Sequence, residues 1–196
     1  MLCLPERALP AAVAAVSAGT IVGHCSASEP LATLAPHDRF SMHPLMSLIG
    51  ESTRFEGAVC AIDGSGHHTR ALAETLATAL GMRPIHVRAE QRALYHAAAS
   101  IASNYLVTLE WAAERAASLC GISREELVPL VQASLDAWRI HGFAGAITGP
   151  VARGDDATVQ RQRDAIAGAA PDLLPLFDTM AQTTRVALQQ PQDGPP

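Results

Sequence analysis

Short polar and titratable side chains gather on one stripe of a predicted helix and could together hold a small polar substrate. At about 100° per residue, residues 92–104 place on this stripe Arg92, His96, Ser100, Ser103 and Asn104. His96, Ser100 and Asn104 follow one another at intervals of one turn. An imidazole exchanges a proton near neutral pH, and a hydroxyl and an amide bind polar groups. The pattern is equally typical of the solvated side of an amphipathic helix, and both interpretations remain open.

The chain contains no lysine, because all 14 of its basic residues are arginine. This composition excludes Schiff-base chemistry and a lysine acid or base. Proton transfer near pH 7 must therefore come from histidine, cysteine, tyrosine or a carboxyl with a shifted pKa.

The composition predicts a soluble globular protein. The 196 residues are 48% hydrophobic and carry a net charge of −5, which favours neither nucleic acid nor an anionic membrane as partner. The apolar run at 8–18 is too short to span a bilayer, and no targeting signal precedes it. The eight histidines show no zinc-ligand spacing, which argues against a metal-dependent hydrolase.

The four cysteines are scattered and form no CxxC pair. Three of them lie within apolar runs. We therefore expect reduced, buried thiols in a cytoplasmic protein.

The first half of the chain predicts an α/β layer with a largely parallel sheet. Strands are expected at 20–25, 39–43, 58–62 and 83–87, and helices at 8–17, 31–34 and 67–80. A dinucleotide-binding layer should also contain a GxGxxG turn. The nearest match, Gly64-Ser65-Gly66, lacks the third glycine, so we do not expect it to cradle a phosphate.

The second half predicts helices alone, with the boundary after residue 88. The expected helices span 89–120, 124–140, 155–167 and 171–188. Ser123 and Glu126 form a capping box, and Asp155 or Asp156 can cap the third of these helices. The tail at 189–196 should be disordered.

Four segments in this order resemble one family: HPLMSL at 43–48, FEGAVCAIDG at 55–64, LYHAAASIASNYLVTL at 94–109 and ITGPVARGD at 147–155. They resemble Rossmann-like oxidoreductase homologues whose C-terminal part is domain of unknown function 2520. The family resembles pyrroline-5-carboxylate reductase, ketopantoate reductase and 6-phosphogluconate dehydrogenase more distantly. The resemblance implies a nucleotide-binding domain followed by a helical domain of the 6-phosphogluconate dehydrogenase C-terminal type.

The resemblance also implies an activity, the transfer of hydride from NAD(P) to a small carbonyl or imine. In ketopantoate reductase a lysine and two asparagines line the cleft at similar spacings. By that likeness His96 would donate the proton, and Ser100 and Asn104 would hydrogen-bond the substrate. Related reductases often dimerise through the helical domain, so a homodimer is expected.

The start of the chain departs from the family. LCLP at 2–5 resembles the end of the family's fourth strand, and the first βαβ units and their glycine turn do not precede it. At about 30 residues per unit, roughly 70 to 80 residues would be missing. Residues 1–88 would then be the C-terminal part of a nucleotide-binding domain, and this chain would not bind NAD(P) in the usual way.

The other candidate residues each have a structural alternative. His43 ends a strand, where α/β layers bind ligands, or it merely caps that strand. Thr148 is a candidate substrate contact, or it merely belongs to a tight turn between helices. Arg153 could reach the cleft, although pairing with Asp155 is the favoured interpretation. We expect Cys60 in the core, His67 and His68 in solvent, and Trp111 and Trp138 as packing anchors of the helical half.

Two functions of different classes therefore remain. One is the NAD(P)-dependent oxidoreductase, acting on a small-molecule substrate. The alternative is a catalytically inactive binding or dimerisation module.

Overall fold

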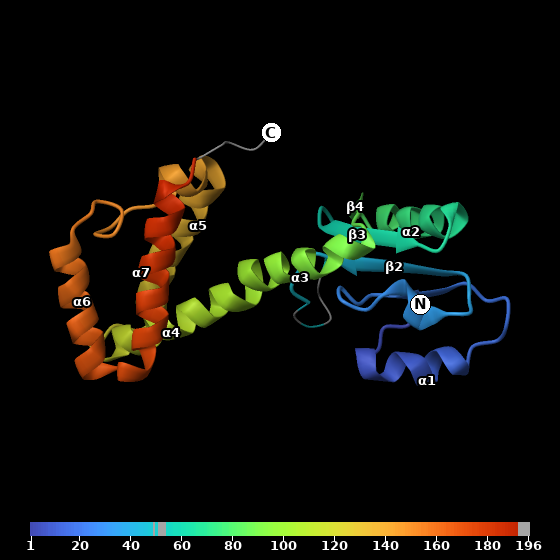
Figure 1. Ribbon diagram of the computed structural model, residues 1–196, viewed down its shortest axis with the longest axis horizontal. Helices are drawn as coiled ribbons and strands as arrows, with labels where there is room; N and C mark the ends of the chain where they lie inside the picture. Colours follow the sequence, from blue (N-terminus) through green and yellow to red (C-terminus); the bar gives the residue numbers. More distant parts are fainter. Residues whose placement is uncertain (49, 51–53, 192–196) are drawn as a thin grey trace. The chain divides into compact units, whose positions relative to one another are not determined.

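A computed structural model describes residues 1–48, 50 and 54–191 (Figure 1). The chain divides into two compact units, Met1–Leu106 and Val107–Pro196. The strands are β1 (Val22–His24), β2 (Arg39–Pro44), β3 (Val59–Gly64) and β4 (Arg83–His86). The α-helices are α1 (Leu9–Ala14), α2 (His67–Ala79), α3 (Arg92–Ser100), α4 (Leu106–Ser118), α5 (Arg124–Ala146), α6 (Asp156–Ala169) and α7 (Leu174–Gln189). Short 3₁₀ turns lie at Glu6–Ala8, Leu31–Leu34, Ala89–Gln91 and Pro171–Leu173.

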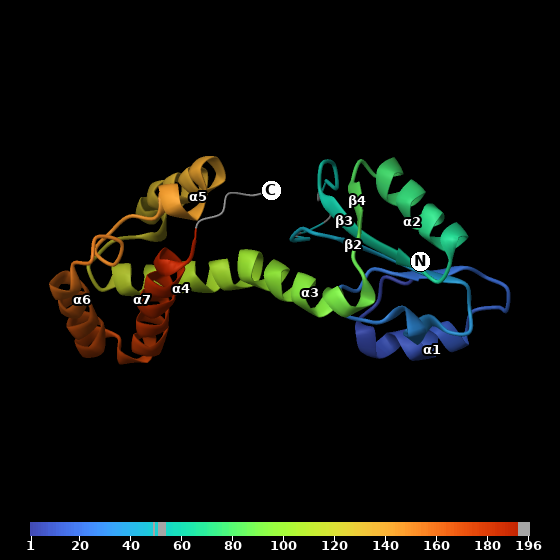
Figure 2. The same ribbon diagram turned by 45° about the horizontal axis from the view of Figure 1, so that its top comes forward.

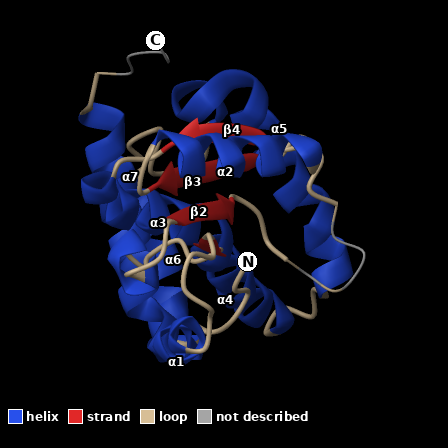
Figure 3. Cartoon of the chain, turned by 90° about the vertical axis from the view of Figure 1, so that its right-hand side faces the viewer, coloured by secondary structure: helices blue, strands red, loops and turns tan. Residues whose placement is uncertain are grey.

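The four strands form one sheet in sequence order, β1-β2-β3-β4. Figure 3 shows β2, β3 and β4 side by side in that order. β1 pairs with β2 and β3 with β4 in parallel, whereas β2 and β3 run antiparallel. The predicted α/β layer with a largely parallel sheet, followed by helices, is therefore confirmed.

The alternation of side chains along β2 separates a core face from a face that carries polar groups. Phe40 and Met42 point into the main apolar cluster, with Cys60, Ile62 and the small residues of α2. The intervening Ser41 is also fully buried, but it lies against α3. The strand thus packs one face against α2 and presents the other to the N-terminal end of α3.

A second apolar cluster lies on the α1 side of the sheet. Val13 of α1 packs there with Val22 of β1 and Leu34 of the Leu31–Leu34 turn. Figures 1 and 2 show α1 and α2 on opposite faces of the sheet. Leu2 adds a parallel bridge to His24, which places the N-terminal segment beside β1.

The helical caps follow the sequence closely. The Ser123 amide donates to Glu126 Oε2 at 2.8 Å, which confirms the capping box at α5. Asp155 Oδ1 accepts the Thr158 amide at 3.0 Å and caps α6. Gly142, with φ of 65°, breaks the helical geometry inside α5.

Three details differ from the sequence predictions. The helix expected at 89–120 is not uniform, because Ile101–Tyr105 forms a π-helical segment between α3 and α4. Trp111 and Trp138 are 51% and 62% exposed, so they are not packing anchors in this structure. Cys3 and Cys120 are exposed, whereas Cys60 is buried as predicted.

The second unit has a small described core, which is centred on Ala112, Ala170 and Leu173. Four surface ion pairs link its helices: Arg115–Asp172, Arg124–Glu114, Arg163–Asp178 and Arg185–Asp156. Exposed pairs of this kind contribute only about 0–1 kcal/mol each. None of the described helices is both long and apolar enough to cross a membrane. Most of the predicted disordered tail, 192–196, lies outside the described residues, and the domain boundary after residue 88 stays a prediction.

Candidate functional site

A cleft of about 600 Å³ lies between the segment that follows β2 and the α3 helix, wholly within the first compact unit. Its polar lining comes from two elements: His43 and Ser47 on the β2 side, and Tyr95, His96, Ser100, Ser103 and Asn104 on the helical side. No acidic side chain lines this cleft among the described residues. It therefore suits a small polar ligand that is neutral or anionic.

His43 and Tyr95 form the interior end of this polar lining. His43 Nδ1 lies 2.8 Å from Tyr95 Oη, and the two rings meet edge to face. Burial, together with the charges of His96 and Arg92, lowers the pKa of His43 to about 4. Burial is also the main reason why the pKa of Tyr95 is raised to about 12. At neutral pH the phenol is therefore protonated and the imidazole neutral, and the Tyr95 hydroxyl also lies 3.5 Å from the His43 carbonyl, to which it can donate.

The direction of the hydrogen bond between His43 and Tyr95 depends on which ring nitrogen of His43 carries the proton. If Nδ1 accepts, the ring proton sits on Nε2, which leaves His43 a hydrogen-bond donor there. The exposed ring of His96 lies 6.3 Å from that of His43, measured between centroids. The cleft therefore holds two imidazoles in different settings, one neutral and positioned by a phenol, the other open to solvent.

The π-helical segment bounds the outer end of the cleft. A π turn adds a residue to the helical repeat, and such turns are frequent at functional sites. This one carries Ser103 and Asn104. Ser103 Oγ lies 2.7 Å from Ser47 Oγ, so the helix and the segment after β2 meet at this point.

A second cavity, of about 400 Å³, adjoins the first, because His43 and His96 line both. Its other polar lining includes Cys25, Ser26 and His24. The His24 side chain is fully buried, and neither of its ring nitrogens has a hydrogen-bond partner among the described residues. Burial and the charge of Arg92 lower its pKa. A buried, unpartnered imidazole at a strand end is a candidate contact for a bound polar group.

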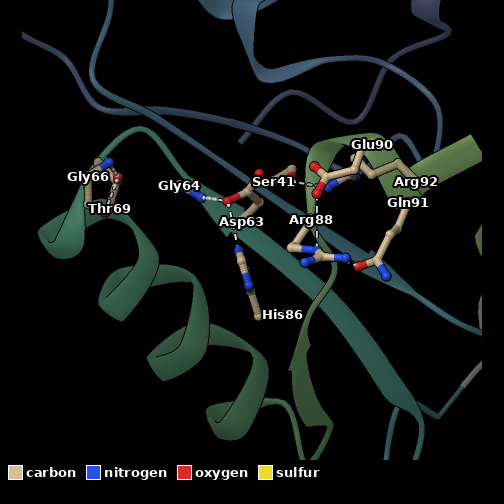
Figure 4. Close-up of polar contacts among 10 residues, drawn as sticks. All are labelled: Ser41, Asp63, Gly64, Gly66, Thr69, His86, Arg88, Glu90, Gln91 and Arg92. Atoms are coloured by element: carbon tan, nitrogen blue, oxygen red, sulfur yellow. Dashed lines mark hydrogen bonds and ion pairs between the residues drawn. The ribbon is translucent and has the colours of Figure 1, made fainter.

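Arg92 joins α3 to the sheet near both cavities. The residue is 5% exposed, and its guanidinium donates to Ser41 Oγ at 2.9 Å, to the Ser26 carbonyl at 3.0 Å and to the Ala27 carbonyl at 3.3 Å. Figure 4 shows it reaching from the start of α3 to Ser41 on the strand. Arg92 therefore anchors α3 to the segment after β1 and to the middle of β2, and its buried positive charge acts on His43 and His24.

The glycine turn after β3 has a structural role. The Gly64 amide donates to Asp63 Oδ1 at 2.8 Å, and the Gly66 amide donates to Thr69 Oγ1 at 3.1 Å (Figure 4). These two amides thus already have side-chain partners. Across residues 1–48, 50 and 54–191, no group of three or more His, Cys, Asp and Glu side chains is arranged to hold a metal ion.

Residues 58–184, well over half of the chain, match the sequence profile of the family described as domain of unknown function (DUF2520). The chain belongs to this family. A search of the curated proteins finds no match.

Solved structures share the fold of this DUF2520 chain. Protein TM1727 from Thermotoga maritima superimposes with a TM-score of 0.85 at 23% identity, over 96% of this chain and 78% of that chain. The Bacteroides fragilis protein BF3122, described as a "putative NADP oxidoreductase", superimposes with a TM-score of 0.80 at 18% identity, over 94% of this chain and 73% of its own. The chain therefore shares the Rossmann-like fold of these two proteins. Its kinship with the three more distant reductase and dehydrogenase families stays a prediction.

The structure brings together four of the six predicted site residues. His43, His96, Ser100 and Asn104 all line the cleft. Thr148 and Arg153 are exposed and lie in the other compact unit, so their part in the site stays a prediction.

Sequence reasoning missed three side chains of the site: His24, Ser47 and Tyr95. A local signal existed for His24, because it lies at the end of a strand, where α/β layers bind ligands. The contacts of Ser47 and Tyr95 depend on how α3 crosses the end of β2, and no local pattern encodes this crossing.

Proposed function

We propose that the cleft is the substrate half of an NAD(P)-dependent oxidoreductase site that reduces a small carbonyl or imine. The observation behind the proposal is that the hydrogen-bonding groups on α3 and its π turn share one cleft with the neutral His43 of β2. The oxidoreductase-like fold supports it. NAD(P), when bound, supplies the hydride.

His96 is the proton donor in this proposal. It lies at the junction of the two cavities and is exposed, so bulk water can return its proton after each turnover. Ser100 and Asn104, one and two turns along the helix, hydrogen-bond the substrate. His43 donates from Nε2 and fixes the substrate's orientation without adding charge.

The described residues fit only one end of the cofactor. The cavity that contains His24 offers this imidazole to a nicotinamide ring, because neither ring nitrogen has a partner among the described residues, whereas the Ser26 hydroxyl already bonds Glu6 on the same lining. The two glycine-turn amides named above are already bonded, and the chain contains no GxGxxG sequence to cradle a pyrophosphate. We therefore expect weak binding of the whole dinucleotide by this chain.

The test compares reduced nicotinamide mononucleotide, which lacks the pyrophosphate and adenosine, with NADPH as hydride donor. A panel of small oxo acids, aldehydes and cyclic imines is screened by the loss of reduced-nicotinamide absorbance. We expect substrate-dependent oxidation, with little advantage for NADPH. General acid catalysis contributes about 10²–10⁴-fold, so His96→Ala should lower kcat within that range. His67→Ala, a change at an exposed histidine of α2, is the matched control. Undiminished kcat in His96→Ala would remove His96 from the reaction.

A second candidate function, a dimerisation module, has its own supporting observation. α5 extends over 23 residues, yet none of them is buried. Its exposed apolar side chains include Leu130, Trp138 and Ile140. An isolated helix gains little stability in water. We therefore expect a second copy of the chain to cover α5 in a homodimer.

Sedimentation velocity tests the dimer. We expect a species of twice the 20.6 kDa chain mass, and Trp138→Glu should dissociate it. Glu110→Gln on α4, which leaves the apolar face of α5 intact, is the control. A monomer at high concentration would remove this second function.

A further inference from the structure

Two cysteines that are far apart in the sequence meet at the wall of the second cavity. The Leu2 amide donates to the Gly23 carbonyl at 2.7 Å, and Leu2 bridges His24 in parallel. The next residues on these two segments are Cys3 and Cys25, and their sulfur atoms lie 3.6 Å apart.

We propose that Cys3 and Cys25 form a redox-active pair that closes to a disulfide when a peroxide is supplied. Neighbouring strands lie about 4.8 Å apart, and disulfides span Cα separations of about 4.4–6.8 Å. Parallel neighbours therefore already have the required backbone separation. The sulfur atoms need only approach from 3.6 Å to about 2.0 Å, which side-chain rotation can achieve.

The two thiols differ in a way that sets the order of events. Cys3 is exposed, whereas Cys25 is half-buried. Burial, followed by the hydrogen bond with Cys3, raises the pKa of Cys25 to about 12, so Cys25 remains a thiol at neutral pH. The oxidant therefore reacts first with Cys3.

The chemistry balances with hydrogen peroxide as co-reactant. The Cys3 thiolate attacks one peroxide oxygen, the O–O bond breaks, and Cys3 sulfenic acid and hydroxide form. The Cys25 sulfur then attacks the Cys3 sulfur, the S–O bond breaks, and the hydroxyl leaves with the Cys25 proton as water. Together two thiols and one peroxide give one disulfide and two waters.

A disulfide between Cys3 and Cys25 would affect the candidate site through one wall of the second cavity. Cys3 and Cys25 line the same cavity as His24, His43 and His96. Closing the pair ties the N-terminal segment to the end of β1 and fixes that wall of the cavity. The inference does not depend on the proposed oxidoreductase activity, because thiol chemistry alone tests it.

The experiment uses the full chain carrying Cys120→Ser, which removes the exposed cysteine that could cross-link two copies. The folded protein is treated with one equivalent of hydrogen peroxide, alkylated and digested with trypsin without reductant. Cleavage at arginine separates Cys3, in peptide 1–7, from Cys25, in peptide 8–39, and Cys60, in peptide 55–70. We expect peptides 1–7 and 8–39 to be joined, with a mass loss of about 2 Da for the two hydrogens, and only one of the three remaining cysteines to be alkylated.

Three variants serve as controls. Cys3→Ser and Cys25→Ser, each in the same background, should both abolish the joined peptides, whereas Cys60→Ala should leave them unchanged. Any of three results would overturn the proposal: three alkylated cysteines, a link to peptide 55–70, or over-oxidation of Cys3 with no link.

Discussion

Replacing Arg92 by methionine should destabilise the first compact unit by about 2–4 kcal/mol. The side chain donates three hydrogen bonds, to one hydroxyl and two carbonyls, from a position that is 5% exposed. Methionine retains much of the aliphatic length but supplies no donor. Ser41 and Ala27 are buried, so their polar groups lose their partner where water does not readily reach them.

The magnitude follows from these lost partners. A buried polar group left unsatisfied costs about 1–3 kcal/mol. Two such groups remain in the variant, while water can reach the half-buried Ser26 carbonyl. The variant no longer has to desolvate a guanidinium, and this offsets part of the loss. The sum gives the expected range.

The assay must report on the sheet itself. Trp111 and Trp138 both lie in the second compact unit, so their fluorescence does not follow unfolding of the sheet. Amide hydrogen exchange of β1 and β2, measured by NMR, gives the opening free energy of these strands directly.

Arg88→Met is the matched control for Arg92→Met. The Arg88 side chain is 62% exposed and contacts only Gln91 and Glu90 among its described polar partners (Figure 4). Surface changes of this kind usually stay within about 0.5 kcal/mol. If the two variants changed the opening free energy equally, Arg92 would not be the anchor described here.

Three further predictions concern other parts of the chain. Gly64→Ala places a Cβ 2.5 Å from the Arg70 amide nitrogen and should lower the free energy of unfolding by about 2 kcal/mol or more. Gly66→Ala, with no atom within 4 Å of its Cβ, should lower it by less than about 1 kcal/mol. Equal midpoints of unfolding in urea would contradict the close approach at Gly64. The pKa of His43 is lowered to about 4, but in the unfolded chain it protonates near 6.5. The unfolded state therefore binds more protons between these values, and stability should fall as the pH drops from about 6.5 to about 4, less steeply in His43→Gln. Asp155→Ala should lower the exchange protection of the first turn of α6 by about 1 kcal/mol, and unchanged protection would rule out the cap.

The strands could be predicted because their signals are local. Val59–Gly64 is an apolar run that ends in a glycine turn, and the structure places its centre in the core. The caps at Ser123 and Asp155 are likewise local, because each joins one side chain to a backbone amide three residues away. Such features need no knowledge of the remainder of the chain.

The candidate site was predicted in part for the same reason. His96, Ser100 and Asn104 share a stripe by helical spacing alone, and they do line one cleft. Arg92 belonged to the same predicted stripe, yet it is buried and bonds Ser41 in the middle of β2. Arg92 is separated from the other residues of the stripe because the start of α3 packs against β2. This contact joins residues about fifty positions apart in the sequence.

The two tryptophans show the opposite limit. Aromatic residues on an amphipathic helix are usually packing anchors, but Trp138 lies on a helix without a single buried residue. Hydropathy indicates that a side chain favours burial. It does not indicate whether the same chain or a partner covers that side chain.

The most direct test of the substrate cleft is an NMR titration of the labelled protein with the oxo acids, aldehydes and cyclic imines of the proposed assay. We expect a binding compound to shift the His43 and His96 ring resonances together with the amides of Ser100 and Ser103. Residues of α6 and α7 should not shift. Saturable binding whose shifts lie outside this cleft, or no binding by any compound of these three classes, would contradict it.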